Sequence, residues 1–268
     1  MLDLRPDFHR HFPGDEPAVF DRIMNLEGQI FRSLAGRKTL RFTLDGKGYF
    51  AKLHFGVGWR EIIKNLLVAR RPVLGAREEW CAIHRLEELG IATMSVAGFG
   101  ERGCLPSRRQ SFLITDELAN TTSLEDYCRE WPVEAPPASL KRALIEKVAT
   151  IARSLHNHGV NHRDFYICHF LLDTNSLEKP YAAGEMVLYL IDLHRVQIRA
   201  RTPRRWIEKD LAALHFSSMN IGLTRRDRLR FLKVYRGMPL RQFLDDEGIF
   251  WDNVGRKARK LLLKPDED

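Results

Sequence analysis

The chain has 268 residues, of which 44% are hydrophobic and 29% are charged, and its formal net charge is +8. This composition suits one bilobal domain or two modest domains and excludes a wholly disordered chain. No apolar run reaches the roughly 18 residues that a membrane-spanning helix needs, and the N-terminus lacks the apolar region of a signal peptide. We therefore expect a cytoplasmic protein.

The cysteines are predicted to be free or buried thiols. They are widely spaced and form no C-x-x-C pair, which would indicate a metal or redox site. A cytoplasmic protein also keeps its thiols reduced. The four residues are Cys81, Cys104, Cys128 and Cys168.

The sequence pattern of residues 27–52 is typical of β-strands. Apolar and polar side chains alternate over 39–44, as in a half-buried strand. Further strands are predicted at 30–31 and 49–53. The sequence Asp45-Gly-Lys-Gly48 predicts a tight hairpin turn, because glycine tolerates positive φ.

The strand over 49–53 carries Lys52 near its end, in the sequence Phe-Ala-Lys. This resembles the V-A-I-K of protein kinases, which places a lysine against the nucleotide phosphates. The turn over 33–38 stands where kinases have their glycine-rich loop, but Gly36 is its only glycine. Gly36 is therefore a candidate for nucleotide binding, although cover of the phosphates by this loop is in question.

Two helices follow in the pattern. Residues 59–67 have apolar positions at helical spacing, and this helix either packs on its own lobe or lies at a membrane interface. Residues 78–90 form a helix that stops at a glycine. Kinases pair a glutamate of this helix with the strand lysine, and Glu79 is the first candidate, with Glu78 as the alternative. Either could equally be an ordinary N-terminal glutamate favoured by the helix dipole.

Strands are predicted at 95–100 and 111–115, and Asp116-Glu117-Leu118 follows them. In a kinase-like chain this is the crossing between lobes, where adenine bonds to the backbone. These three residues are therefore candidates for nucleotide binding. The predicted domains are an N-lobe over 1–117 and a C-lobe over 118–268.

The second half is predicted to be mostly helical. Ser123 begins a helix with an S-x-x-D cap, and Ser139 caps a long helix with apolar residues at steps of three and four. A helix over 206–214 carries Asp210, which resembles the aspartate that braces the kinase catalytic loop. The last helices are predicted at 224–235, 240–244 and 254–263.

The loop after the long helix contains His162-Arg163-Asp164, which resembles the kinase pattern H-R-D, four residues, Asn. Asp164 takes the position of the base, and His169 replaces the asparagine. Since imidazole is a poor magnesium ligand, a metal role for His169 is an open question. Asp192 ends an apolar strand at the position of the metal-binding aspartate of D-F-G.

Positive charge is concentrated between Arg199 and Arg241, where twelve Lys and Arg residues stand against three Asp and Glu residues. This +9 stretch is either a solvated basic face or the surface for an anionic partner such as phosphate, nucleic acid, an acidic protein or an anionic membrane. Few aromatic residues lie among these charges, which disfavours single-stranded nucleic acid. We expect no nucleic-acid partner.

Three other hypotheses compete. His162, Asp164 and His194 mimic the two-histidine, one-carboxylate site of iron oxygenases. A zinc cluster is a weaker alternative, and its ligands would be His156, His158, His162 and His169. A degenerate kinase fold acting as a basic scaffold is the non-enzyme alternative, and the replaced asparagine and missing glycine-rich loop favour it.

Several stretches together resemble the lipopolysaccharide-core heptose kinases, a branch of the kinase superfamily. The match covers roughly residues 27–240, and its most specific parts are 49–52, 55–62, 72–76, 161–172 and 191–195. It resembles most the enzymes that phosphorylate the first heptose of the inner core. The resemblance implies an α+β, bilobal, protein-kinase-like fold with a small β-rich N-lobe and a larger, mostly helical C-lobe. It also implies a bacterial cytoplasmic enzyme that uses ATP and Mg²⁺.

The resemblance further implies roles for single residues. Lys52, fixed by Glu79, would hold the α- and β-phosphates, Asp192 would bind Mg²⁺, and Asp164 would accept the proton of the sugar hydroxyl. Arg195 and the basic stretch would meet the anionic inner core.

His162 and Arg163 are counted with Arg195 as candidates for substrate binding, although a structural role in the loop is also predicted for them. The acceptor is membrane-anchored, so peripheral contact with the inner face of the inner membrane is expected. Another core sugar or a protein hydroxyl is the alternative acceptor. The missing A-P-E signature disfavours a dedicated protein kinase.

Overall fold

The computed structural model describes residues 1–34, 36–56, 75–105, 107–177, 181–238 and 240–263, with only the backbone described over 240–247. The helix predicted over 59–67 lies outside the described residues. The chain divides into two compact units, Met1–Arg85 with Met94–Leu118 and Leu86–Thr93 with Ala119–Asp268. Residues 86–93, which the predicted bounds place in the N-lobe over 1–117, thus belong to the second unit. Hydrogen bonds from Leu190 N to Ala92 O and from Thr93 to Leu190 O tie them to the second unit.

The first unit is built on an antiparallel six-stranded sheet with the strand order β1-β5-β6-β4-β3-β2. The five strands predicted for this unit are all present, and β1 adds an unpredicted edge strand. Their bounds are β1 Leu2–Leu4, β2 Gln29–Leu34, β3 Arg37–Leu44, β4 Lys47–His54, β5 Val96–Arg102 and β6 Gln110–Asp116.

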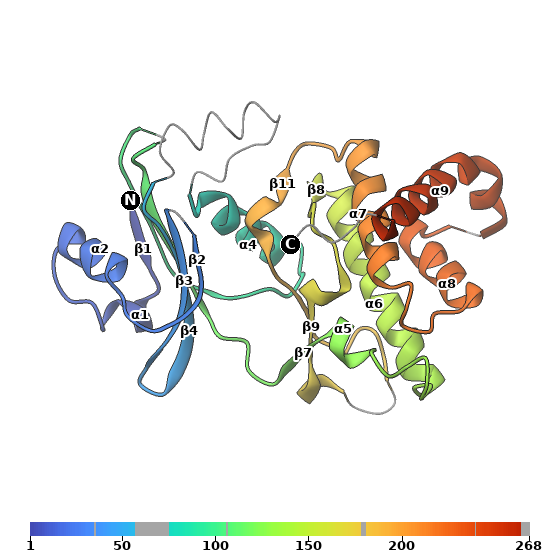
Figure 1. The fold of residues 1–268 in the computed structure, drawn as a ribbon, viewed down its shortest axis with the longest axis horizontal. Coiled ribbons are helices and arrows are strands. Elements are labelled where there is room, and N and C mark those ends of the chain that lie inside the picture. Colours follow the sequence, from blue (N-terminus) through green and yellow to red (C-terminus); the bar gives the residue numbers. More distant parts are fainter. Residues whose placement is uncertain (35, 57–74, 106, 178–180, 239, 264–268) are drawn as a thin grey trace. The chain divides into compact units, whose positions relative to one another are not determined.

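The central strand β4 shows how the sheet divides its two faces. Tyr49, Ala51 and Leu53 are buried in the core beneath α1 (Pro6–His9) and α2 (Glu16–Met24). Because successive side chains of a strand point to opposite faces, Lys52 points to the other face. That face carries α4 (Arg77–Glu88), as Figure 1 shows.

Two hairpin turns depend on positive φ. Asp45 and Gly46 have φ of 48° and 77° and join β3 to β4 in a two-residue loop, which confirms the predicted turn. Gly36, with φ of 78°, lies between β2 and β3. It therefore occupies a short hairpin turn rather than an extended glycine-rich loop.

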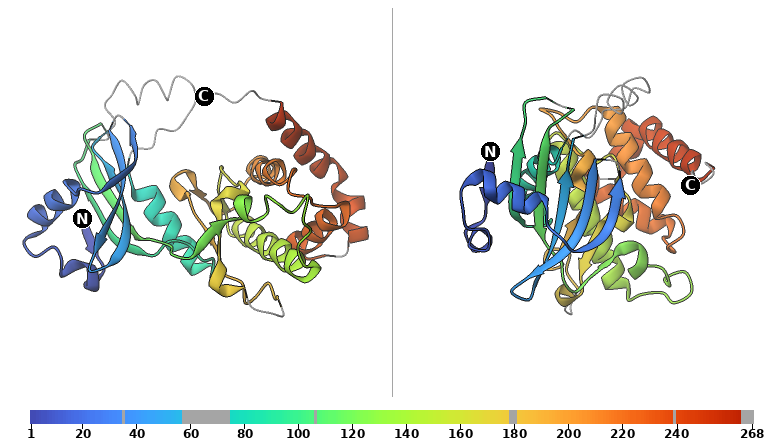
Figure 2. Two further views of the ribbon diagram at one scale, coloured as in Figure 1. Left: turned by 60° about the horizontal axis from the view of Figure 1, so that its bottom comes forward. Right: turned by 60° about the vertical axis from the view of Figure 1, so that its left-hand side comes forward.

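The second unit is mostly helical and contains two small sheets. One has the order β10-β9-β7 and the other pairs β11 with β8. Figure 2 shows the helices as green to red coils, and α6 packs on α8 while α7 packs on α9. The bounds are α5 Leu124–Tyr127, α6 Ala138–Asn157, α7 Arg204–Ser217, α8 Arg225–Arg236, α9 Leu240–Leu262, β7 Thr121–Ser123, β8 Val160–Asn161, β9 Phe170–Asp173, β10 Leu188–Leu190 and β11 Gln197–Ile198, with short 3-10 turns η1 Ile167–His169, η2 Thr174–Ser176 and η3 Leu193–Arg195.

The helices predicted within the described residues are present, but some of their predicted ends are wrong. Ser123 caps α5 as predicted, accepting a hydrogen bond from the backbone of Asp126 at 3.0 Å. The cap predicted at Ser139 is wrong, because α6 begins at Ala138 after Pro137, which leaves Ser139 inside the helix. The helices predicted at 240–244 and 254–263 form one continuous helix, α9. None of the helices described is both long and apolar enough to cross a membrane.

Candidate active site

The strand lysine pairs with the predicted glutamate. Lys52 Nζ donates a hydrogen bond to Glu79 Oε1 at 2.6 Å, and the Glu79 side chain is 3% exposed. Glu78, the alternative, is exposed to solvent. The first turn of α4 therefore presents one buried carboxylate to β4 and leaves the other in water. This is the geometry that holds an ammonium group in place for phosphate binding.

The segment after β6 is held by its own unit. Asp116 accepts hydrogen bonds from Arg5 and Lys47 at 2.9 Å, and Glu117 accepts two from Arg41 at 2.6 and 2.7 Å. Burial raises the pKa of the Asp116 carboxyl, but the Arg5 and Lys47 bonds outweigh it and lower that pKa. The backbone N–H groups of Asp116 and Glu117 also bond within the unit. Adenine binding by Asp116, Glu117 and Leu118 stays a prediction.

The loop of the second unit is braced by one buried carboxylate of α7. Asp210 is fully buried and accepts the backbone N–H groups of His162 and Arg163 at 2.7 and 2.8 Å. Arg163 has φ of 77°, a strained conformation for a residue with a side chain. The Asp210 bonds hold it there, which confirms the predicted brace.

His162 does not face substrate. Its side chain is fully buried, and Nε2 bonds to the carbonyl oxygen of Ile191 at 3.0 Å. Burial lowers its pKa, so the imidazole is neutral. The ring ties the loop to the residue before Asp192, which fits the structural role predicted for His162 and does not support the alternative of substrate binding.

The predicted base is bonded to an arginine. Arg195, at the end of η3, donates from Nη1 to Oδ1 of Asp164 at 2.7 Å. The Arg195 side chain is exposed and that of Asp164 is partly exposed. Arg195 therefore orients the Asp164 carboxylate, and part of the Asp164 side chain remains accessible to solvent.

Asp192 lies between two imidazoles. Its Oδ1 bonds to His194 Nδ1 at 2.5 Å, and its Oδ2 is 3.5 Å from His169 Nε2. The other ring nitrogen of His169 bonds to the backbone oxygen of Asp164 at 2.7 Å. Burial lowers the pKa of His169, but the contact with Cys168, the Asp164 carbonyl and the Asp192 charge together raise it to about 9.

Magnesium suits Asp192 better than it suits His169. Mg²⁺ takes oxygen ligands and usually binds through one or two carboxylates and substrate phosphates. His169 is tied through Nδ1 to the backbone oxygen of Asp164, and its Nε2 faces the Asp192 carboxylate, so the geometry favours His169 as a partner of that carboxylate. The role of His194 was missed in the kinase interpretation, although its place two residues after Asp192 was the available signal.

The metal alternatives lack a converging ligand set. His162, which both need, has its Nε2 committed to a backbone oxygen, and Asp164 is paired with Arg195. His156 bonds instead to Tyr235 at 2.8 Å. Within the described part of the chain, no three His, Cys, Asp or Glu side chains are grouped to hold a metal ion. The iron and zinc hypotheses are therefore not supported by the geometry.

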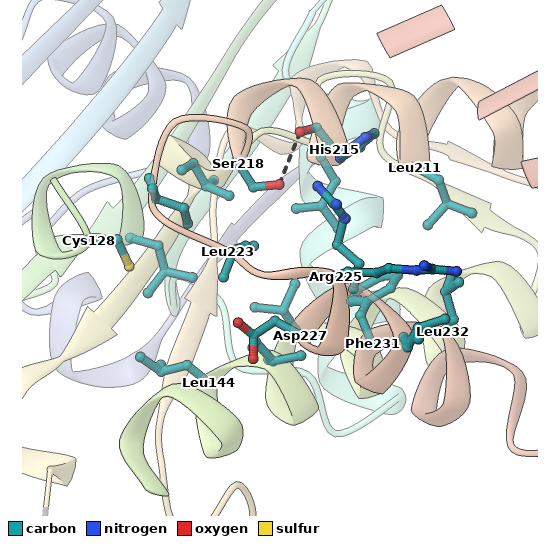
Figure 3. A pocket seen from close by; sticks show the side chains of 18 of the residues that line it. Cys128, Leu144, Leu211, His215, Ser218, Leu223, Arg225, Asp227, Phe231 and Leu232 are labelled. Atoms are coloured by element: carbon teal, nitrogen blue, oxygen red, sulfur yellow. Dashed lines mark hydrogen bonds between the residues drawn. The ribbon is translucent and has the colours of Figure 1, made fainter. Parts of the chain in front are cut away.

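An apolar pocket of about 420 Å³ lies among the helices of the second unit (Figure 3). Side chains of α6, α7, α8 and α9 line it, including Leu144, Leu211, Phe231 and Val254. Its volume is in the range of small-molecule sites. Sequence reasoning missed it, because the apolar faces that line a pocket have the same helical spacing as those that fill a core.

These features define a class of protein. A strand lysine fixed by a helix glutamate, a loop aspartate braced by a buried carboxylate, and a second aspartate after a strand are the parts of a protein-kinase-like phosphotransferase. The lipopolysaccharide kinase (Kdo/WaaP) family model matches residues 21–235, and the chain belongs to this family. The family assignment confirms the predicted fold class and the predicted enzyme class, an ATP-dependent sugar kinase.

Known relatives match over nearly the whole chain. The chain is 53% identical to the lipopolysaccharide core heptose(I) kinase WaaP of Pseudomonas aeruginosa, over 97% of this chain and 95% of the relative. It is 53% identical to the enzyme of the same name from Escherichia coli strain K12, over 97% of each chain. A solved structure described as WaaP in complex with acyl carrier protein is 48% identical, with a TM-score of 0.82 over 97% of this chain and 99% of that one.

Proposed function

We propose that this chain transfers the γ-phosphoryl group of ATP to the first heptose of the lipopolysaccharide core. The observation that carries the proposal is the near full-length similarity to relatives named as heptose(I) kinases. The local settings of Lys52 in the first unit and of Asp164 and Asp192 in the second support it, because each residue occupies the element that the chemistry requires.

The nucleotide is held by charge and position. Lys52, fixed by Glu79, binds the α- and β-phosphates of ATP, and Asp192 supplies the carboxylate ligand of Mg²⁺. When bound, the ion would neutralise phosphate charge. His194 and His169 hold the Asp192 carboxylate in one orientation before the nucleotide arrives.

The acceptor hydroxyl is oriented by Asp164. Its carboxylate accepts the hydroxyl proton as the sugar oxygen bonds to the γ-phosphorus, while the bond to the β-phosphate oxygen breaks and ADP leaves. Arg195 keeps the carboxylate in position. Arg163 acts through the loop backbone, and its side chain faces Trp206 rather than Asp164.

The test uses purified protein, ATP with Mg²⁺, and core lipopolysaccharide from a strain that lacks its heptose(I) kinase. We expect the core to gain one phosphate by mass spectrometry, with its position on the first heptose fixed by fragmentation. Asp164→Asn should abolish transfer and keep nucleotide binding. Phosphate on another sugar, or on an added protein substrate, would favour the alternative acceptors. No turnover with any acceptor would favour the scaffold hypothesis.

A second candidate activity is binding of acyl carrier protein. The structural relative was solved with that partner, and the apolar pocket of this chain suits an acyl chain in chemistry and size. We expect a decanoyl-loaded carrier to co-elute with the chain in size-exclusion chromatography and the unloaded carrier to bind more weakly. Leu223→Arg, which places a charge at the pocket wall shown in Figure 3, should weaken the loaded complex. Equal binding of both carriers would remove the pocket from this proposal.

We also propose peripheral contact with the inner face of the inner membrane, since the acceptor of the named relatives is a glycolipid. The formal charge of +8 favours an anionic surface. Sedimentation with anionic vesicles, but not with neutral ones, is the expected result. Equal sedimentation with both would argue against an electrostatic contact.

A further inference from the structure

The segment that ends the first unit is held by side chains on both faces of the sheet. Asp116 is the last residue of β6, and Glu117 and Leu118 follow it before the second unit begins at Ala119. Asp116 pairs in register with Tyr49 of β4, whose side chain is buried in the core beneath α1 and α2. Residues directly opposite each other on two strands place their side chains on the same face, so the Asp116 carboxylate lies on the core face.

Arg5 holds Asp116 on the core face. Its two terminal nitrogens donate to the two oxygens of the Asp116 carboxylate, each at 2.9 Å. The same guanidinium donates to Asp7 of α1 at 2.6 and 3.1 Å, and the backbone N–H of Arg5 donates to the carbonyl oxygen of Ala97 in β5 at 3.0 Å. Lys47 adds a further bond to the Asp116 carboxylate at 2.9 Å. Arg5 is therefore fixed by α1 and β5 and in turn orients Asp116.

Arg41 holds Glu117 on the opposite face. Its Nε and Nη2 donate to the two Glu117 oxygens at 2.6 and 2.7 Å. Arg41 of β3 pairs in register with Phe50, which lies two residues before Lys52 on β4. Because side chains alternate along a strand and match across a pair, Arg41, Phe50 and Lys52 share one face. The Arg41–Glu117 pair therefore lies on the face of the lysine that is proposed to bind the phosphates.

The backbone of this segment is held as well. The N–H of Asp116 donates to the carbonyl oxygen of Ser95 at 2.9 Å, and that of Glu117 donates to the carbonyl oxygen of Gly48 at 3.0 Å. A Cβ atom at Gly48 would collide with the Glu117 carboxylate, so this glycine leaves the space in which the carboxylate meets Arg41. The segment is thus fixed through both its backbone and its side chains. We call Arg5, Arg41 and the two carboxylates that they hold the strand-end clamp.

The clamp lies within reach of a nucleotide bound at Lys52. Lys52 pairs in register with Leu113, three residues before Asp116 on β6. At about 3.3 Å per residue, this separates Lys52 from Asp116 by about 10 Å along the sheet. A nucleotide whose phosphates meet Lys52 therefore has room for its sugar and base along β4 and β6. A segment that is already fixed loses little conformational freedom on binding, which favours affinity.

We propose that Arg5 and Arg41 are positioning residues for the nucleotide, which hold the segment after β6 in the place where it contacts the base of ATP. This rests on the proposed function and deepens it. The side chains of Asp116 and Glu117 then serve to hold the segment and do not contact the nucleotide themselves.

The test compares ATP kinetics in Arg5→Gln and Arg41→Gln. The KM for ATP should rise at least about fivefold in each, while kcat and the KM for core lipopolysaccharide change less than about twofold, because an interaction lost equally from ground and transition states raises KM alone. Arg5→Lys, which keeps a donor for Asp116, should restore part of the affinity. Arg102→Gln is the matched control, since it removes an arginine–carboxylate pair with Asp21 in the same unit, and it should match the wild type.

Inorganic tripolyphosphate separates the two ends of the nucleotide. It carries the phosphates of ATP without the base, so its inhibition constant should stay unchanged in Arg5→Gln and Arg41→Gln and should rise in Lys52→Ala. Equal weakening of ATP and tripolyphosphate in the arginine variants would mean that the whole site is disturbed. Unchanged ATP affinity would mean that the segment needs no clamp. Either result overturns the proposal.

Two further variants cover the case in which loss of an arginine unfolds the protein. Gly48→Ala should displace the Glu117 carboxylate without removing a charge, and should raise the KM for ATP as Arg41→Gln does. Arg5→Gln/Asp116→Asn should bind ATP no more weakly than Arg5→Gln, because the two side chains act as one unit. An additive loss would give Asp116 a contact of its own with the nucleotide and would contradict the proposal.

Calorimetric titration with Mg-ATP measures binding without turnover. If the wild type binds ATP and the arginine variants bind it at least about fivefold more weakly, the clamp stands even where no phosphate is transferred, and only the proposed function fails. If the wild type transfers phosphate and the variants bind ATP normally, the proposed function stands and the clamp fails. A wild type that binds no ATP overturns both.

Discussion

Arg195 donates a hydrogen bond to Asp164 at 2.7 Å across 31 residues of sequence. Arg195 ends the short turn η3, whose N-terminal cap is Asp192. The turn thus joins the proposed base and the proposed metal ligand through one short segment. Asp192 itself has φ of 61°, which is a left-handed backbone conformation. Its carboxylate contacts the imidazole rings of His169 and His194. Orientation of the two carboxylates is therefore coupled in this fold.

The first prediction concerns this coupling. Arg195→Gln should lower kcat by about tenfold to a hundredfold, because a misplaced base loses the near-attack geometry. Nucleotide binding should change little, and Arg195→Lys should restore part of the loss. Steady-state kinetics with core acceptor provide the measurement, with Arg142→Gln as the control for loss of a surface cation. A normal kcat in Arg195→Gln would show that Asp164 needs no such support.

The second prediction separates two adjacent glutamates. Glu79→Gln should lower kcat by about a hundredfold, because Lys52 loses its charged partner and its fixed position. Glu78→Gln is the matched control, since its side chain is exposed on the same helical turn, and it should behave like the wild type. Kinetics with ATP and core acceptor measure both variants. Equal losses would mean that helix α4, rather than the Lys52 contact, was disturbed.

The sequence predicted those parts of the fold in which local pattern and burial agree. The alternation over 39–44 and the Asp45-Gly46 turn predicted β3 and its hairpin, because a strand buried on one face must alternate. The kinase-like spacing predicted that Asp210 would brace the loop, and it does so through two backbone bonds. Motif spacing is therefore sufficient to identify the loop from the sequence.

Other features had no local signal. The edge strand Leu2–Leu4 is too short for a periodicity, and its pairing with β5 is a long-range contact. The two helices predicted at 240–244 and 254–263 are one helix, α9, which continues through Gly248 because an isolated glycine is tolerated in a helix. The sequence also does not predict that the His162 side chain is fully buried, because histidine is polar and lies in a polar loop. Tertiary packing decides each of these cases.

The third prediction concerns the cap of α8. Asp227 and Thr224 form a capping box, and Lys141 of α6 lies 3.1 Å from the Asp227 carboxylate. Asp227→Asn should destabilise the fold by about 1–3 kcal/mol at neutral pH, because it removes a cap charge and an ion pair that are largely buried. Asp252→Asn, on the exposed face of α9, is the control and should change the melting temperature little.

The pH dependence of this effect has a defined sign. Burial raises the pKa of Asp227, but the bonds from Thr224 and Lys141 outweigh it and lower that pKa. The stabilisation is therefore present above about pH 4, the ordinary carboxyl pKa, and is lost as the pH falls through the lower folded value. The difference in melting temperature between wild type and Asp227→Asn should be smaller at pH 3.5 than at pH 5 and pH 7. A constant difference at all three would exclude the carboxylate charge as the cause.

The fourth prediction concerns thiol reactivity at the apolar pocket. Cys128 lines the pocket and is 2% exposed, and burial raises its pKa to about 12, whereas Cys104 is exposed. At pH 8.5 a disulfide reagent should therefore modify Cys104 rapidly and Cys128 only on unfolding, because the thiolate is the reactive form. The Cys104→Ser variant, followed by absorbance and peptide mass mapping, isolates the slower thiols.

The buried thiol also predicts a loss of stability at high pH. Its folded pKa lies above the unfolded value of about 8.5, so the neutral thiol stabilises the fold below that pH. As the pH rises from about 9 towards 12, the unfolded chain ionises first and this contribution is lost. Cys128→Ala removes the titration, so its stability relative to wild type should improve over that range in denaturant unfolding. Fast labelling of Cys128 in the native protein, or a pH-independent difference between the two proteins, would show that solvent reaches this thiol.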